Sequence, residues 1–198
     1  MYYKEVKLSR INTALLVAII LVNGYIILLP FASNVLFWFQ KNHTSRTQQL
    51  TETIRSQPGP TSAPLAENRL IIPVMLFDEA VNEGKDMSTL RKGLWHLPYT
   101  STPDKGGNTV FVGHRFTYTN PHGVLYYLDK VHVGDEIGLT WNGKKYLYKV
   151  SNVVQVKPND LAVEAQTADP EITIYTCTPL WLPKDRLVVV AKPETEIK

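Results

Sequence analysis

The chain contains a single cysteine, Cys177, whose thiol must either pack in the core or react, because a lone cysteine cannot form an intramolecular disulfide. Cys177 ends the short β-like run EITIYTC (171–177), and Arg186 follows after an eight-residue, proline-bounded gap. In a strand, alternate side chains share a face, so Ile172 and Ile174 lie opposite Cys177. The thiol is therefore expected on the less apolar face, at the end of the strand.

A cysteine nucleophile needs a nearby base or cation to form its thiolate, and the chain offers five histidines. His114 ends the run NTVFVGH (108–114), where a strand-end side chain can project over a groove. His96, in GLWHLPYT, is a second candidate because it precedes a proline-bounded loop. A hydrogen-bonded structural histidine is as common an interpretation for His114 as a catalytic one. The other histidines lie in connecting segments, where a solvated environment is usual: His43, His122 and His132.

From residue 69 onward the sequence predicts one mainly β domain. Short helices are expected near 87–92 and 123–130. The pair Asn142 and Gly143 lies between two alternating runs, which predicts a type I′ hairpin. These features favour a closed or nearly closed β-barrel. The predicted strands are rich in Val, Ile and Tyr and are bounded by Gly, Pro, Asn or Asp: 70–77, 108–116, 135–141, 144–156, 171–177 and 186–192.

The N-terminal part of the chain predicts a membrane anchor. Residues 1–12 hold three basic side chains and one acid, and the apolar segment that follows, 13–39, is long enough to cross a bilayer. The basic end is expected in the cytoplasm and the rest of the chain outside. A signal peptide is the alternative, although its apolar region is usually about 7 to 15 residues and ends in a small-x-small cleavage site. Residues 40–68 are polar and predict a spacer, helical over 45–56, ahead of a domain at 69–198.

The charge balance argues against nucleic-acid binding. Residues 40–198 hold 18 basic and 17 acidic side chains, so no basic patch is implied. Asp160, Glu164 and Glu171 fall in one predicted loop, but their spacing is not that of a dedicated calcium site. We expect neither a metal nor another cofactor.

Together these segments resemble the sortase family. TVFVGH (109–114) is similar to the strand that ends in the catalytic histidine of sortases, and RLVV (186–189) to the strand that carries their arginine. ITIYTC (172–177) matches their T-L-x-T-C signature, with Ile174 in place of Leu. The likeness covers residues 69–192, and the N-terminal anchor also fits. It implies a closed eight-stranded sortase-like β-barrel with short helices, preceded by a transmembrane helix.

The resemblance implies a membrane-anchored cysteine transpeptidase with its catalytic domain outside the cell. Such enzymes cut a sorting signal similar to Leu-Pro-x-Thr-Gly between Thr and Gly, and join the Thr to an amine of a cell-wall precursor or to a pilin lysine. Cys177 would be the nucleophile, His114 would transfer protons, Arg186 would stabilise the oxyanion, and Thr176 would position the substrate. Apolar side chains in the flanking loops would line the groove: Leu161, Val163, Leu180 and Trp181.

Two other functions stay open on the sequence. A catalytically silent, membrane-anchored barrel would bury Cys177 and merely hydrogen-bond His114. A cysteine hydrolase would use the same pair and resolve the thioester with water. Arg186 also has an ordinary interpretation, a solvated charge or a surface ion pair after Asp185. Arg115, next to the histidine, is a competing cation to which we assign no role.

Overall fold

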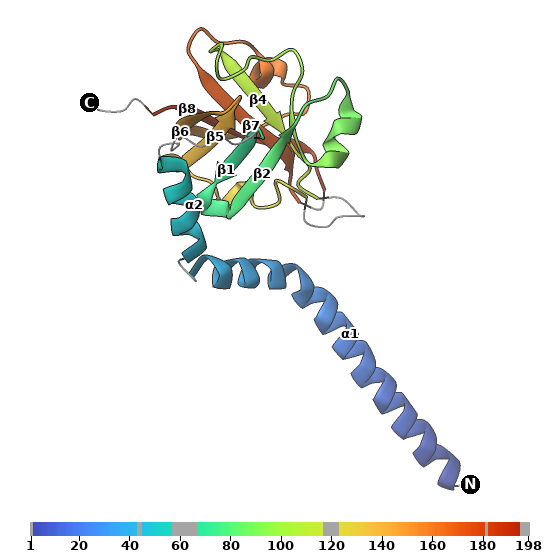
Figure 1. Ribbon diagram of the computed structural model, residues 1–198. Helices are drawn as coiled ribbons and strands as arrows, with labels where there is room; N and C mark the ends of the chain where they lie inside the picture. The colour runs from blue at the N-terminus through green and yellow to red at the C-terminus, as the bar shows by residue number, and fades with distance from the viewer. Residues whose placement is uncertain (1, 43–44, 57–66, 117–122, 181, 195–198) are drawn as a thin grey trace. The chain divides into compact units, whose positions relative to one another are not determined.

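The computed structural model describes residues 2–42, 45–56, 67–116, 123–180 and 182–194. It divides into two compact units, Met1–Thr44 and Ser45–Lys198. The first unit is the helix α1 (Tyr2–Asn42), the long blue helix of Figure 1. Its 18-residue window Arg10–Ile27 is long and apolar enough to cross a membrane and overlaps the predicted anchor. A signal sequence has the same character, so α1 by itself does not separate these two alternatives.

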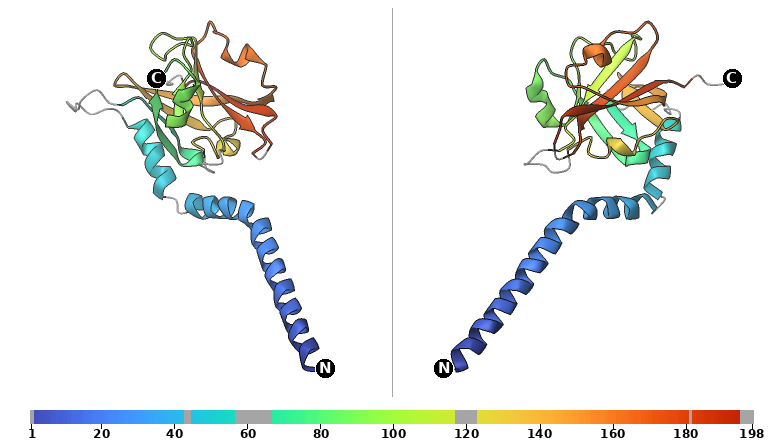
Figure 2. Two further views of the ribbon diagram at one scale, coloured as in Figure 1. Left: turned by 90° about the vertical axis from the view of Figure 1, so that its right-hand side faces the viewer. Right: turned by 180° about the vertical axis from the view of Figure 1, so that it is seen from behind.

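The second unit contains a closed barrel, shown from three sides in Figures 1 and 2. The order around the barrel is β1-β2-β3-β4-β7-β8-β6-β5, which confirms the predicted eight-stranded barrel. The pairs β2–β3 and β4–β7 are parallel, and the other neighbours are antiparallel. The strands are β1 (Arg69–Ile72), β2 (Phe77–Asn82), β3 (Leu94–His96), β4 (Asn108–Val112), β5 (Glu136–Trp141), β6 (Lys144–Val156), β7 (Glu171–Thr178) and β8 (Asp185–Pro193).

Two parts of the barrel differ from the sequence prediction. The run 70–77 is not one strand, because the short 3-10 helix η1 (Pro73–Met75) interrupts it and Leu76 adopts a left-handed φ of 56°. The chain reverses there, and β2 pairs antiparallel with β1. The strand β3 was not predicted, because its three residues are all buried and show no alternation.

The predicted type I′ hairpin is confirmed, since φ is 49° at Asn142 and 77° at Gly143. The two short helices expected in the domain are found as 3-10 helices, and the second of them is shorter than predicted. A further 3-10 helix, not predicted, lies between β6 and β7. These helices are η2 (Met87–Lys92), η3 (Leu128–Lys130) and η4 (Leu161–Glu164).

The strand registers separate an inner from an outer face in the part of the barrel that contains the cysteine. Ile172 and Ile174 of β7 are fully buried in the apolar core, and Phe111 of β4 pairs with Ile174 on that inner side. Side chains one residue along point outward, so Val112 and Tyr175 form an outward-facing pair. By the same alternation Cys177 lies on the outer face, as predicted.

The helix α2 (Ser45–Arg55) packs on the outside of this barrel. Its apolar side chains Leu50 and Ile54 form a small buried cluster with Ile71 of β1. The cluster requires a glycine in β5, because a Cβ atom at Gly138 would lie 2.1 Å from Cγ2 of Ile54. The helix predicted over 45–56 is thus confirmed as α2. It belongs to the barrel unit, although the sequence indicated a spacer there.

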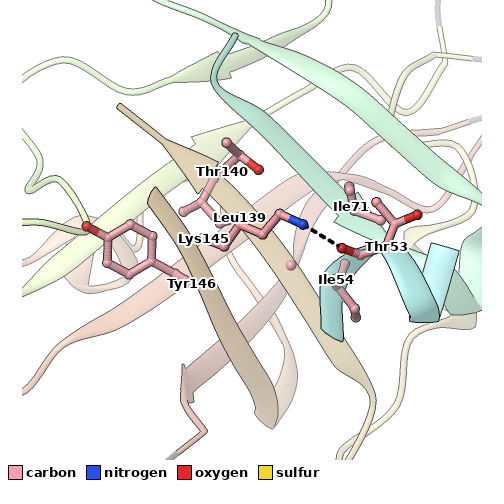
Figure 3. A pocket seen from close by; sticks show the side chains of 8 residues that line it. Thr53, Ile54, Ile71, Leu139, Thr140, Lys145 and Tyr146 are labelled. Atoms are coloured by element: carbon pink, nitrogen blue, oxygen red, sulfur yellow. Dashed lines mark hydrogen bonds between the residues drawn. The ribbon is translucent and has the colours of Figure 1, made fainter. Parts of the chain in front are cut away.

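Polar contacts hold the C-terminal end of α2. The ammonium group of Lys145 donates to the carbonyl oxygens of Thr53 and Ser56, both at 3.0 Å, and the first of these bonds is drawn in Figure 3. A cation near the last carbonyls of a helix also interacts favourably with the helix dipole. Arg55 adds an ion pair with Glu136 of β5.

Candidate active site

Cys177 lies on β7, between strands that carry the other two predicted catalytic residues. In the barrel β7 is flanked by β4 on one side and β8 on the other. Cys177 pairs directly with Arg186 of β8, so both side chains project from the same face of the sheet. Both residues are half-buried, and the thiol is free. A thiol with this exposure is open to a peptide carbonyl, in contrast to a core cysteine.

His114 is brought to the other side of Cys177 by two hydrogen bonds that flank it. The strand β4 ends at Val112, two residues before His114. Thr176, just before the cysteine, donates its hydroxyl to the carbonyl of Gly113 at 2.7 Å. Thr178, just after the cysteine, accepts a bond from Arg115 at 2.8 Å. Because the neighbours of His114 are bonded to the neighbours of Cys177, the histidine lies alongside the cysteine.

The guanidinium of Arg115 has a structural role that the sequence did not reveal. It is buried, with a relative exposure of 9%. Besides Thr178 it donates to the carbonyl of Tyr126 at 3.3 Å and forms an ion pair with Asp129 at 3.1 Å. Its charge is therefore compensated within the loop after His114. Arg115 therefore stabilises this loop, and its guanidinium is not available to bind substrate in place of Arg186.

Two glycines let the loop after β4 fold closely against His114. A Cβ atom at Gly123 would lie 2.3 Å from the carbonyl oxygen of His114, and one at Gly113 would lie 2.6 Å from Val124. The same carbonyl of His114 accepts a bond from the backbone N–H of Leu125 at 3.0 Å. The backbone of the histidine is thus fixed from both of its sides.

Arg186 is left without a carboxylate partner in the described part of the chain. Asp185 is its nearest acid in sequence, yet that carboxylate accepts bonds from Lys157 at 2.9 Å and Gln155 at 2.7 Å. These bonds, that of Lys157 first, hold the pKa of Asp185 below its ordinary value. Within the described ranges Arg186 donates only to the backbone carbonyl of Asp185, at 3.3 Å. Its remaining N–H groups can bind a developing oxyanion or a peptide carbonyl.

Of the residues predicted to position the substrate, one is buried and three are at least partly exposed. Thr176 is buried, with 1% exposure, and its hydroxyl donates to the carbonyl of Gly113, next to His114; its role toward substrate stays a prediction. On η4, Leu161 is 68% exposed and Val163 is half-buried. Leu180, after β7, is also half-buried, and Trp181 lies outside the described residues.

Of the other histidines, the two that the structure describes, His96 and His132, show no sign of a catalytic role. His96 is buried; its Nδ1 lies 3.0 Å from Glu83 and its Nε2 donates to the carbonyl of Ser101 at 2.9 Å. Both ring nitrogens are engaged, which is the pattern of a structural histidine. His132 is exposed, and its backbone N–H donates to Asp135. His43 and His122 lie outside the described residues.

The three acids predicted to fall in one loop do not gather into one site, and Glu171 is in fact the first residue of β7. Asp160 caps η4 by accepting from the backbone N–H of Ala162 at 3.2 Å. Glu164 accepts a hydrogen bond from the hydroxyl of Tyr175 at 2.6 Å. In the described ranges no group of three or more His, Cys, Asp or Glu side chains could hold a metal ion.

The barrel unit therefore belongs to the class of closed eight-stranded β-barrels, with a free cysteine near the end of one strand. The family model of the Sortase domain matches residues 70–194, and the chain therefore belongs to the sortase family. The family implies a transpeptidase-type activity and a place at the cell surface.

Individual relatives agree with this family. Sortase SrtE1 of Streptomyces coelicolor is 32% identical over 103 residues, which are 47% of this chain and 28% of that protein. Sortase D of Bacillus subtilis is 28% identical over 115 residues, 58% of this chain and 55% of that protein. The matches thus span about half or less of these relatives. A solved structure of the Clostridium perfringens Sortase D5 transpeptidase has a TM-score of 0.58 and 25% identity, covering 80% of this chain and 94% of that one.

Proposed function

We propose that this protein is a cysteine transpeptidase that cleaves a Leu-Pro-x-Thr-Gly-like sorting signal between Thr and Gly. It would transfer the cut protein to an amine, supplied by a cell-wall precursor or by a pilin lysine. The observation that carries this proposal is a pair of hydrogen bonds on either side of Cys177: Thr176 donates to the carbonyl of Gly113, and Thr178 accepts from Arg115. These bonds support the proposal because they hold His114 alongside a half-buried thiol, the arrangement that a cysteine–histidine pair requires.

The proposed reaction has two acyl-transfer steps. The thiolate of Cys177 attacks the carbonyl carbon of Thr, the C–S bond forms, and the C–N bond to Gly breaks. His114, as imidazolium, gives its proton to the departing amine. The incoming amine then attacks the thioester, loses a proton to the neutral imidazole, and releases the thiolate.

Arg186 would stabilise the negative oxygen in both steps. Its side chain shares a face with Cys177 through a direct cross-strand pair, and the neighbouring carboxylate of Asp185 is held by other residues. A preorganised cation that need not leave a partner stabilises developing charge at little reorganisation cost.

The organisation along the chain is proposed as a cytoplasmic N-terminus at 1–12, an anchor at 13–39 and a catalytic barrel at 69–198. The segment 40–68, predicted as a spacer, contributes the helix α2 to the barrel unit. The apolar window of α1 supports the anchor. The barrel would then act outside the cell on secreted proteins, with the enzyme held to the membrane by one helix.

The test uses the unit Ser45–Lys198 with a panel of quenched fluorescent Leu-Pro-x-Thr-Gly peptides, with and without triglycine, and mass spectrometry of the products. We expect ligation to triglycine, its abolition in Cys177→Ala, and a roughly hundred- to thousandfold slower reaction in Arg186→Ala. The exposed histidine variant His132→Ala serves as the matched control for His114→Ala. Water-only products would identify a hydrolase, and the absence of any acyl-enzyme would favour the silent barrel.

A further inference from the structure

The segment that contains η4 lies over the outer face of β4 and β7. Asn108, on the outer face of β4, donates to the carbonyl oxygens of Val163 at 3.1 Å and Ala165 at 3.0 Å. Gln166, which follows η4, donates back to the carbonyl of Asn108 at 3.4 Å, and the next outward-facing pair, Val110 and Thr173, is almost completely buried, with exposures of 0% and 1%. The segment is thus a cover packed on the sheet that carries Cys177.

A second hydrogen bond holds the same cover from β7. The hydroxyl of Tyr175 donates to Oε1 of Glu164 at 2.6 Å, the length of a charge-assisted bond. Burial, and then this bond, raises the pKa of Tyr175, so the hydroxyl remains a donor at neutral pH. Tyr175 shares the outer face with Cys177 and lies two residues before it, a separation of about 7 Å along a strand.

We propose that Tyr175 and Glu164 are positioning residues of the transfer reaction, whose hydrogen bond fixes η4 as a rigid wall of the peptide groove beside Cys177. This inference deepens the proposed function and rests on it. Asn108 holds the cover at the start of β4, and Tyr175 holds it close to the reacting thiol. The wall presents Leu161, which is 68% exposed, to the apolar part of a bound peptide.

The test compares Tyr175→Phe, Glu164→Ala and Glu164→Gln in the full chain, solubilised in detergent. We expect Tyr175→Phe and Glu164→Ala to raise KM for the cleaved peptide roughly tenfold, the size of one lost hydrogen bond, with kcat within about twofold. Glu164→Gln keeps an oxygen acceptor for the tyrosine and is expected to retain a nearly wild-type KM. The double variant should be no worse than either single variant, because both remove the same bond.

Hydrogen exchange supplies a readout that does not need turnover. Amides of residues 157–170 are expected to exchange faster in Tyr175→Phe than in the wild type. The matched control is Tyr146→Phe, a half-buried tyrosine on β6, which should alter neither KM nor this exchange.

Unchanged KM and unchanged exchange in Tyr175→Phe would overturn the inference, as would a loss confined to kcat. If the wild type cleaves no peptide, the proposed function fails and the exchange measurement alone decides whether the bond holds the wall.

Discussion

At the scale of residues, the geometry of the candidate site depends on side chains that would not themselves react. Thr176 and Thr178 flank the cysteine and bond the residues on either side of His114. A bond on only one side would leave the histidine loop free to pivot. Two bonds fix its position along the strand, which general acid catalysis requires because proton transfer depends on close approach.

We predict that Thr178→Val lowers kcat for peptide cleavage about fivefold, because a net hydrogen bond is worth about 1 kcal/mol and the same loss in the transition state slows turnover by that factor. Arg115 would keep Tyr126 and Asp129 as partners, so the loop should stay folded but lose its tie to the cysteine strand. Steady-state kinetics with the cleaved peptide measure this effect.

The control for that variant is Thr173→Val, which removes a buried hydroxyl from the same strand at a distance from the histidine loop. Thr173→Val should leave kcat within about twofold, because Thr173 lies away from the histidine loop. Equal losses in both variants would show that any threonine on β7 affects turnover through stability, and the flanking bonds would then have no special role.

From the sequence, the residues of this candidate site were easier to select than the contacts that hold them in place were to predict. Cys177 and Arg186 are separated by one loop, so a hairpin between two β-like runs already brings them together. The position of His114 depends on β4 being the parallel neighbour of β7, a contact between distant segments that no local pattern encodes. Likewise, alternation placed Thr176 on the apolar face but could not show that its hydroxyl reaches Gly113.

At the scale of elements, the sequence predicted the helix α2 as part of a spacer but did not predict that it packs on the barrel. Most of its side chains are polar, and the apolar pair Leu50 and Ile54, four residues apart, is too short a pattern to predict packing. The surface on which α2 packs cannot be predicted from the sequence either, because it depends on Gly138 having no side chain. The helix becomes part of the barrel unit only through this complementarity of shape.

We predict that Gly138→Ala destabilises the unit Ser45–Lys198 by about 1 to 3 kcal/mol, because the added methyl group overlaps Ile54 and forces α2 away from β5. Urea unfolding followed by circular dichroism gives the free energy of unfolding. The catalytic strands β4, β7 and β8 do not include Gly138, so turnover below the unfolding transition should be unchanged.

The matched control is the same substitution in a fragment that begins at Arg69 and lacks α2. There the methyl group meets no Ile54, and alanine should be neutral or stabilising by up to about 1 kcal/mol, since glycine is unfavourable inside a strand. A similar destabilisation in both fragments would mean that Gly138 is required by the barrel itself rather than by the helix.

At the scale of the whole molecule, a helix long enough to cross a membrane precedes a barrel unit whose charges nearly cancel. The near-neutral charge gives the barrel no electrostatic reason to bind lipid headgroups or nucleic acid. Attachment to the membrane would therefore depend on α1 alone. Loss of that helix should release an intact enzyme.

We predict that the full chain stays in the membrane fraction after alkaline carbonate extraction, and that the unit Ser45–Lys198 does not. Because Cys177 is the only cysteine, a membrane-impermeant maleimide should label it in intact cells that express the full chain, and should not label Cys177→Ala. Labelling only after the cells are permeabilised would place the barrel in the cytoplasm and contradict the orientation inferred from the basic N-terminus. A mature chain whose mass lacks the first 30 or so residues would instead show that the apolar helix is a cleaved signal peptide, of the length expected for one.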